Sequence, residues 1–239
     1  MHGGYFSDPE TAKALIAQLN SAARDRAPAT VADLGGGTGF ILAALRRKKS
    51  FRTARLVNID VSPRQLEQCR LPGLECLSCP AEKVTRGKLL QSGTRGPLML
   101  TMRSLLHYFG GRREQEAFLR KARNLARKGE YFVHQSACFE REEDTALMNE
   151  TYRLMRVNKT YFTCERLSAM LGGCGWKTEK IMRAPALTFT SGEMKCRYGL
   201  SARDISRIRA IAGTKACIKP ARTGFSGKLE YAIFVCRAA

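Results

Sequence analysis

The sequence lacks a long apolar run, a hydrophobic leader and a repeated cysteine pair, and each absence excludes a class of protein. No stretch of the 239 residues reaches the roughly 18 apolar positions of a membrane-spanning helix, and the N-terminus has no signal-peptide core. We therefore expect a cytoplasmic protein with no membrane partner. Cys76 and Cys79 form a C-x-x-C without a second pair, so four zinc ligands are not provided and no metal site is expected.

Acidic residues are also scarce. The chain has 41 lysines and arginines against 21 aspartates and glutamates, which gives a formal net charge of +20. Such a charge attracts polyanions and anionic small molecules but does not determine the fold. The length is sufficient for a full core, and we expect residues 1–239 to form a single α/β domain with insertions.

The most informative stretch is a glycine-rich turn between an apolar strand and an apolar helix, with the sequence VADLGGGTG at 31–39. Glycine lets a ligand approach the backbone closely, and the following helix begins with unpaired N–H groups. A second apolar strand, at about 55–60, ends on Asp60, whose carboxylate can accept hydrogen bonds from a ribose diol. Together these features predict a nucleoside-bearing cofactor across the carboxyl ends of a parallel sheet.

The spacing of the glycines distinguishes between cofactor classes. Dinucleotide folds use G-x-G-x-x-G, whereas Asp33 is followed by a strict alternation of Gly35, Gly37 and Gly39. This D-x-G-x-G-x-G pattern resembles motif I of the class I S-adenosylmethionine (SAM) dependent methyltransferases, and Asp60 falls where their ribose-binding acid lies. The resemblance implies SAM as cofactor and S-adenosylhomocysteine (SAH) as product, with Asp33, the three glycines and Asp60 as cofactor-binding residues.

Helices and strands alternate along most of the chain, which indicates a parallel sheet flanked by helices. Strands are expected at about 30–34, 55–60, 74–77, 97–102, 131–133, from 176, and at 229–236. Their order resembles the Rossmann-like methyltransferase sheet. The resemblance implies seven mostly parallel strands with helices on both faces and an antiparallel last strand beside the sixth.

In such a sheet the ligand lies at the carboxyl ends of the strands. Val61 follows strand two and is expected to pack against adenine. After strand three, methyltransferases often carry an Asp-Ala pair that contacts the adenine amine, but Pro80 stands at the acidic position, followed by Ala81 and Glu82. Either Glu82 or a backbone carbonyl substitutes for the missing acid, or Glu82 is a solvated carboxylate favoured by the helix dipole.

The segment after strand four, with the sequence MRSLLHYF at 102–109, resembles that of small-molecule methyltransferases. The resemblance implies that Met102 and Arg103 approach the methionine part of SAM. His107, and His134 after strand five, are the candidate catalytic bases, because a neutral imidazole accepts protons near neutral pH. The alternatives are a histidine that only holds its loop by hydrogen bonds, and a transfer that needs orientation but no base.

Residues 1–25 are expected to form an N-terminal cap. Ser7 or Asp8, followed by Pro9, marks the start of a helix, and Tyr5 and Phe6 lie just before it. Related enzymes fold such a segment over the cofactor, so the resemblance implies that both aromatic rings exclude water there. The alternative is a leader with no role in the site.

Two stretches exceed what the sheet requires, at about 138–160 and 184–228. The first indicates an amphipathic helical lid, and the second contains an expected short helix at 200–213. Both leave the sheet at its carboxyl-end face, so we expect them to build the substrate pocket. The second is rich in lysine and arginine, a charge that suits an anionic substrate or an RNA backbone.

The sequence thus favours a SAM-dependent methyltransferase acting on a small-molecule acceptor, with the acceptor atom and the oligomeric state undetermined. Two alternatives stand beside it. One is an RNA- or ribosome-associated methyltransferase that uses the basic mouth, for which nucleic-acid binding should weaken steeply with salt. The other is a catalytically inactive SAM-binding module, for which no cofactor turnover is expected.

Overall fold

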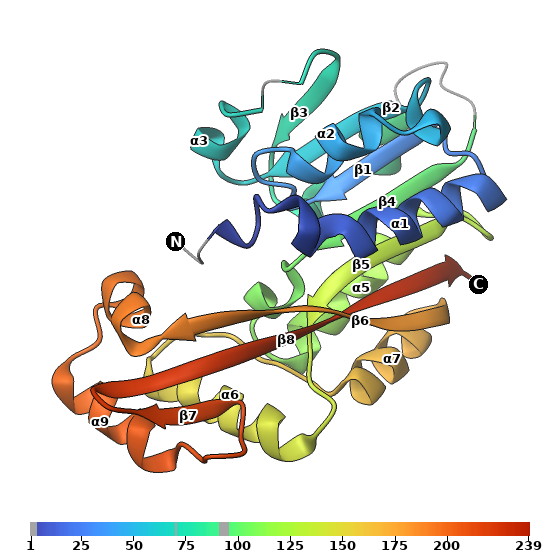
Figure 1. The fold of residues 1–239 in the computed structure, drawn as a ribbon. Coiled ribbons are helices and arrows are strands. Elements are labelled where there is room, and N and C mark those ends of the chain that lie inside the picture. Colours follow the sequence, from blue (N-terminus) through green and yellow to red (C-terminus); the bar gives the residue numbers. More distant parts are fainter. Residues whose placement is uncertain (1–3, 70, 91–95) are drawn as a thin grey trace.

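A single sheet organises the chain in a computed structural model that describes residues 4–69, 71–90 and 96–239. Its strands follow the order β3-β2-β1-β4-β5-β8-β6, and β7 pairs with β8 beside this path (Figure 1). The strands are β1 Thr30–Leu34, β2 Arg55–Asp60, β3 Leu74–Ser78, β4 Leu98–Arg103, β5 Tyr131–Ala137, β6 Trp176–Thr190, β7 Ile218–Ala221 and β8 Gly224–Ala238.

The pairings between β1, β2, β3, β4 and β5 are all parallel, and β8 runs antiparallel between β5 and β6. The predicted mostly parallel sheet with an antiparallel last strand is confirmed. The predicted number of seven strands is wrong, because the second insertion adds β7 and the described residues form eight strands. Its Ile-Lys-Pro-Ala sequence contains Pro220, which lowers strand propensity but is tolerated because β7 has β8 as its one partner strand within the described ranges.

Helices cover both faces of the sheet, as expected. They are α1 Pro9–Asp25, α2 Phe40–Arg46, α3 Pro63–Leu66, α4 Arg86–Leu90, α5 Arg112–Leu125, α6 Glu142–Leu154, α7 Cys164–Gly173, α8 Ser191–Tyr198 and α9 Ala202–Ile211, with 3-10 turns η2 Lys49–Phe51, η3 Ala81–Lys83 and η4 Leu106–Phe109. Asp8 caps α1 by accepting a hydrogen bond from the Glu10 amide at 3.0 Å, which agrees with the predicted helix start.

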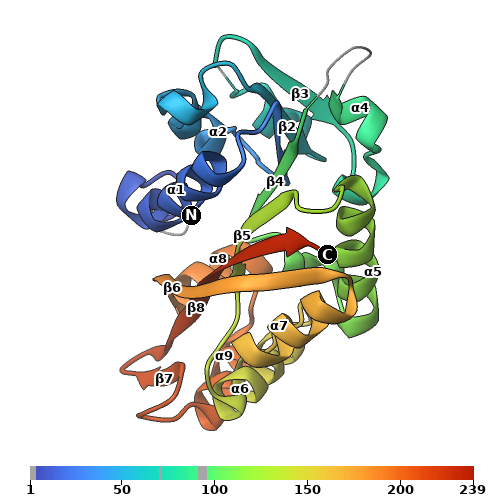
Figure 2. The same cartoon turned by 90° about the vertical axis from the view of Figure 1, so that its right-hand side faces the viewer.

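Successive side chains of the central strands point to opposite faces of the sheet, and each face has its own hydrophobic core. Val31 packs on one face with apolar residues of α1 and α2, whereas Ala32 packs on the other with residues of α5 and α7. Figure 2 shows α1 and α2 on one side of the sheet and α5 and α7 on the other. Burial on both faces explains why β1 carries apolar residues on both of its faces, at Val31, Ala32 and Leu34.

The two insertions form a third core at the carboxyl-end side of the sheet. There α6, α8, α9 and β7 gather around the extended ends of β6 and β8 (Figure 1). Buried aromatic residues from both insertions, among them Tyr152, Tyr161, Phe189 and Phe225, fill this core. None of the helices in the described part of the chain combines the length and apolar character that a bilayer span requires.

Candidate active site

A cavity of about 950 Å³ opens at the carboxyl ends of β1, β2 and β4. The strands, the glycine-rich turn, the N-terminal segment and α8 all contribute to its wall. Its lining comprises Gly4, Phe6, Ser7, Asp33, Gly35, Gly36, Gly37, Thr38, Phe40, Ile41, Ile59, Asp60, Val61, Ser62, Gln65, Gln68, Pro80, Ala81, Glu82, Arg103, Ser104, Leu105, Tyr108, Phe109 and Arg197.

The glycine-rich turn requires glycine for two different reasons. Gly37 has a φ of +57°, a left-handed conformation that costs other residues energy. A Cβ on Gly36 would lie 2.0 Å from the Asn58 side-chain oxygen and 2.7 Å from Asp33. The alternating motif pointed to Gly35, Gly37 and Gly39 but not to Gly36. The need for glycine at Gly36 arises from side chains that are close only in the folded protein, so the spacing of the glycines does not reveal it.

Gly39 lies outside the cavity lining. It is the N-cap of α2 with a φ of +74°, and a Cβ there would meet Leu74 and Cys69 at about 3 Å. Its role as a direct cofactor contact is therefore not supported by its position. Gly39 instead lets the backbone at the start of α2 lie close to the Leu74 and Cys69 side chains.

Asp60 connects the two motifs that the sequence singled out. Its carboxylate accepts one hydrogen bond from the Gly37 amide at 2.9 Å and another from the Ser62 amide at 2.8 Å. The glycine-rich turn after β1 is thereby fastened to the end of β2. Two backbone donors hold the carboxylate at the cavity wall.

Asp33 is a buried carboxyl group at the same wall, with 1% of its surface exposed. Neither of its side-chain oxygens has a hydrogen-bond partner within the described ranges. Burial raises the pKa of Asp33 to about 7; the nearby charge of Arg103 opposes this rise and that of Asp60 adds to it. A buried acid of this kind is suited to pairing with a cation that enters the cavity.

Arg103 fastens the N-terminal segment over the cavity. Its guanidinium donates hydrogen bonds to the carbonyl oxygens of Phe6 and Tyr5 at 3.1 and 3.4 Å, and to the Thr11 hydroxyl at 2.9 Å. It also lies 5.2 and 5.4 Å from the centroids of the two aromatic rings. Residues 1–3 of the predicted cap lie outside the described part of the chain.

The side chains of Phe6 and Tyr5, whose carbonyl oxygens both bind Arg103, point to different places. Phe6 lines the cavity, whereas the Tyr5 ring is buried against Tyr231 at a centroid distance of 5.6 Å. The Tyr5 hydroxyl accepts a hydrogen bond from Gln135 at 2.9 Å. Tyr5 thus holds the segment in place and does not reach the predicted cofactor position itself.

The residues after β2 and β3 that were predicted to contact adenine line this cavity. The Val61 side chain lines the cavity and is 65% exposed, which leaves an apolar surface available to a ligand. Pro80, Ala81 and Glu82 line the same region at the start of η3. The structure therefore brings these residues together around one part of the cavity.

Met102 and Arg103 point in opposite directions because side chains alternate along a strand. Arg103 lines the cavity, and Met102 is fully buried in the core beneath the opposite face. The Met102 side chain does not line this cavity, and the approach of Met102 to the cofactor stays a prediction. The sequence did not resolve which residue of the pair has its side chain in the cavity wall.

His134 does not reach the cavity. Its ring is fully buried between Phe132 and Phe234, at centroid distances of 4.5 and 5.1 Å, and its Nδ1 lies 2.9 Å from the Ser136 hydroxyl. Burial lowers its pKa to about 3. The predicted strand ended at 133, but β5 continues to Ala137, so His134 is an interior strand residue. This position does not fit the predicted role of a base.

His107 is buried in η4, with its ring 4.5 Å from that of Tyr108 and 5.2 Å from that of Tyr161. It lies outside the lining, while its neighbours Tyr108 and Phe109 form part of it. Neither histidine is therefore positioned in the cavity wall. No group of three metal-ligating side chains is found among the residues that the structure describes.

Three further residues form a cluster at the β4 side of the cavity that the sequence did not reveal. Arg197 of α8 donates a hydrogen bond to the Tyr108 hydroxyl at 3.0 Å. Lys159 follows α6, and its ammonium lies 4.1 Å from the centroid of the Tyr108 ring. We call Tyr108, Lys159 and Arg197 the insertion cluster, because each insertion supplies one of its cations.

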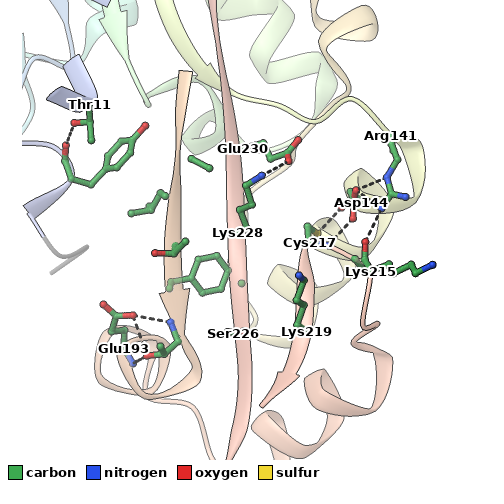
Figure 3. Close-up of a pocket in the computed structure, with 18 of the residues that line it drawn as sticks. Thr11, Arg141, Asp144, Glu193, Lys215, Cys217, Lys219, Ser226, Lys228 and Glu230 are labelled. Atoms are coloured by element: carbon green, nitrogen blue, oxygen red, sulfur yellow. Dashed lines mark hydrogen bonds and ion pairs between the residues drawn. The ribbon is translucent and has the colours of Figure 1, made fainter. Parts of the chain in front are cut away.

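A second cavity, of about 740 Å³, lies along the extended ends of β6 and β8. Figure 3 shows two ion pairs in its wall, Lys228 with Glu230 at 3.0 Å and Arg141 with Asp144 at 2.7 Å. Glu193 caps α8. Neither the glycine-rich turn nor Asp60 contributes to the lining of this second cavity.

Comparison with known proteins supports the fold. No protein-family model matches the chain, and no curated protein matches it significantly. A solved structure of a proposed methyltransferase from Bacillus halodurans is similar, with a TM-score of 0.69, 16% identity and coverage of 93% of this chain and 97% of that chain.

Two further solved structures illustrate the range of chemistry on this fold. The 1,6-didemethyltoxoflavin-N1-methyltransferase of Burkholderia thailandensis, determined with its substrate and SAH, has a TM-score of 0.57 at 16% identity, with coverage of 97% of this chain and 80% of that one. The cyclase SpnF has a TM-score of 0.57 at 13% identity, with coverage of 92% and 80%. The chain thus has the Rossmann-like fold of class I methyltransferases, as predicted, and its activity must be argued from its site.

Proposed function

We propose that this protein is a SAM-dependent methyltransferase that acts on a small-molecule acceptor. The observation that carries the proposal is the position of Asp60, which two amides hold at the wall of a cavity beside a glycine-rich turn. A carboxylate offers about four lone-pair positions, and two of them remain for the hydroxyls of a ribose. This arrangement fits the nucleoside part of SAM.

Asp33 fits the other end of the cofactor. Its buried carboxyl group lacks a hydrogen-bond partner within the described ranges, so a ligand ammonium group would compensate its burial. The α-amino group of SAM is such a cation. Asp33 and Asp60 thus suit the two polar ends of one ligand.

Val61, Ala81 and Glu82 suit the adenine. The exposed apolar surface of Val61 can cover one face of a planar base, and burying it is favourable by about 25 cal/mol per Å². The Glu82 carboxylate is available to accept a hydrogen bond from an exocyclic amine. This restores the contact that Pro80 cannot make.

When bound, SAM supplies an electrophilic methyl group on its sulfonium sulfur. The protein orients donor and acceptor for an in-line displacement, and orientation alone contributes much of the acceleration. Phe6, fastened through Arg103, covers the cavity and excludes water. No base is assigned, since neither His107 nor His134 lines the cavity.

A second candidate, RNA methylation, is motivated by the basic residues of the second insertion. Between positions 195 and 228 one acidic residue, Asp204, accompanies nine basic ones: Lys195, Arg197, Arg203, Arg207, Arg209, Lys215, Lys219, Arg222 and Lys228. Asp204 is occupied by the Ser201 cap and by Arg156. An RNA partner predicts binding that falls steeply with salt and is lost when Arg203, Arg207 and Arg209 become Glu.

The test is SAH production from SAM by the purified protein, measured with a panel of small acidic, neutral and basic acceptors and with transfer RNA. Acceptor-dependent SAH production from a small molecule supports the proposal. Production with transfer RNA alone supports the second candidate. SAM binding without turnover by any acceptor would favour the inactive module.

A further inference from the structure

The insertion cluster brings two basic side chains together at Tyr108, a residue of the cavity wall. Arg197 lines the cavity directly, and Lys159 lies behind the Tyr108 ring, where 8% of its surface is exposed. The Lys159 ammonium donates a hydrogen bond to the Tyr198 hydroxyl at 3.2 Å and lies 5.2 Å from the centroid of the Tyr152 ring. Aromatic rings and phenol oxygens thus surround this lysine.

Neither cation is balanced by an acid. Among the ion pairs of the described residues, none includes Lys159 or Arg197, and their hydrogen bonds go to tyrosine hydroxyls. Cation–π contacts compensate only part of the cost of burying an ammonium group. Burial, and then the charge of Arg197, lowers the pKa of Lys159 to about 7.

The surrounding lining is apolar and partly aromatic. Phe6, Leu105, Tyr108 and Phe109 form this part of the cavity, and the acids of the lining, Asp33, Asp60 and Glu82, come from β1, β2 and η3. A ligand in this region would meet apolar surface together with uncompensated positive charge. A flat apolar molecule with a negatively charged substituent matches both properties.

We propose that the insertion cluster binds an acidic group of the methyl acceptor, with Arg197 as the pairing cation and Lys159 as a second cation behind Tyr108. The acceptor class is therefore a small aromatic acid. This inference rests on the proposed function, because it assigns the cavity beside the cofactor to an acceptor. It gives the basic second insertion a local role in substrate recognition.

The experiment measures binding of three probes to the SAH-bound protein: benzoate, phenyl phosphate and the neutral benzamide. We expect at least one anionic probe to bind about tenfold or more tightly than benzamide, because charge-assisted hydrogen bonds to Arg197 are available only to the anions. Benzoate or phenyl phosphate as the tighter of the two identifies a carboxylate or a phosphate as the preferred group. Equal binding of all three probes, or no anion binding at millimolar concentration, would overturn the inference.

Variants separate the cluster from the general positive charge. Arg197→Gln should abolish the preference for anions, and Lys159→Met should reduce it. Arg207→Gln, an exposed arginine of α9 outside the cavity, is the matched control and should retain the preference. Anion preference that survives in both Arg197→Gln and Lys159→Met would contradict the proposal.

SAH binding to the unmodified protein is measured first. Failure of SAH to bind would contradict the proposed function as a whole. SAH binding without a preference for anionic probes would contradict the acidic acceptor alone. The two failures are therefore distinguishable in one series of titrations.

Discussion

The Asp60 carboxylate and the Gly37 amide, 23 residues apart in the chain, are joined by a hydrogen bond of 2.9 Å at the carboxyl end of the sheet. Ser62 donates a second hydrogen bond to the same carboxylate at 2.8 Å. The acid is thereby oriented without a ligand, and binding would not have to immobilise it. Preorganisation of this kind lowers the entropic cost of recognition.

Removal of this acid should weaken cofactor binding. Asp60→Ala deletes the acceptor for the ribose hydroxyls, and we expect SAM affinity to fall by about 1.5–3 kcal/mol, or roughly ten- to 150-fold. Calorimetric titration measures the change. The control is Glu165→Ala, an exposed acid on α7 outside the cavity, which should bind SAM like the unmodified protein. Equal affinity of Asp60→Ala would contradict the assigned role.

SAM affinity should depend on pH through Asp33. Its pKa of about 7 means that the acid is largely protonated at pH 6, so an entering ammonium group must displace that proton. We expect affinity to fall as pH decreases from 7 to 5, by up to about tenfold per pH unit. Asp33→Asn should bind more weakly at pH 7 and show a flat profile over the same range. A profile that keeps its slope in this variant would assign the effect to another group.

Because Gly36 is crowded by neighbouring side chains, even an alanine at this position should impair SAM binding. Gly36→Ala places a methyl group 2.0 Å from Asn58 and 2.7 Å from Asp33, so the turn must move and SAM binding should be lost or reduced more than tenfold. Gly172→Ala is the control, because Gly172 lies in α7 with open space around it. That change should leave SAM binding intact and stabilise the helix by about 0.5–1 kcal/mol. Tight SAM binding by Gly36→Ala would show that the turn is less constrained than the structure indicates.

His134 should matter for stability and not for methyl transfer. His134→Leu removes the contact with the Ser136 hydroxyl and should lower the free energy of unfolding by about 1–3 kcal/mol. The rate with saturating substrate should stay within a few-fold of the original. Urea denaturation and single-turnover kinetics measure the two effects separately. A hundredfold slower transfer with unchanged stability would restore the histidine as a catalytic group.

Lys159 should make stability increase with pH. Its pKa is about 7 in the folded protein and about 10.5 when unfolded, so between these values the unfolded chain binds more protons. The resulting gain approaches 1.4 kcal/mol per pH unit over that window and is absent below pH 7. Arg197 is the charged group that faces Lys159, and burial raises the pKa values of Tyr152 and Tyr198, which keeps their phenols neutral.

Urea denaturation between pH 7 and 10 tests this linkage. Lys159→Met should be more stable than the unmodified protein at pH 7, and the difference should shrink as pH rises. Lys88→Met, at an exposed lysine of α4, is the control and should show no such trend. Parallel pH profiles for Lys159→Met and the unmodified protein would contradict a buried, uncompensated ammonium group.

The sequence predicted those features that depend on local pattern. The turn at 31–39 and Asp60 were recognisable because backbone approach and ribose recognition require particular residues at particular spacing. The strands β1 and β4 were equally clear, since burial on both faces favours apolar residues at most of their positions. Most of these residues do line one cavity.

The features it missed depend on tertiary geometry. Whether Met102 or Arg103 faces the ligand is decided by strand register, and the depth of His134 by how far β5 continues. The insertion cluster unites Lys159 and Arg197, which are 38 positions apart on two insertions without a recognisable motif. Only packing against a common tyrosine brings them together.

The most direct test of the central claim is calorimetric titration of the purified protein with SAM, SAH and NAD. The account predicts that SAM and SAH bind and that NAD does not. The Asp60 carboxylate suits a single ribose, and the alternating glycines differ from the G-x-G-x-x-G turn that binds the pyrophosphate of a dinucleotide. Binding of NAD without SAM, or no binding of SAM and SAH, would contradict it.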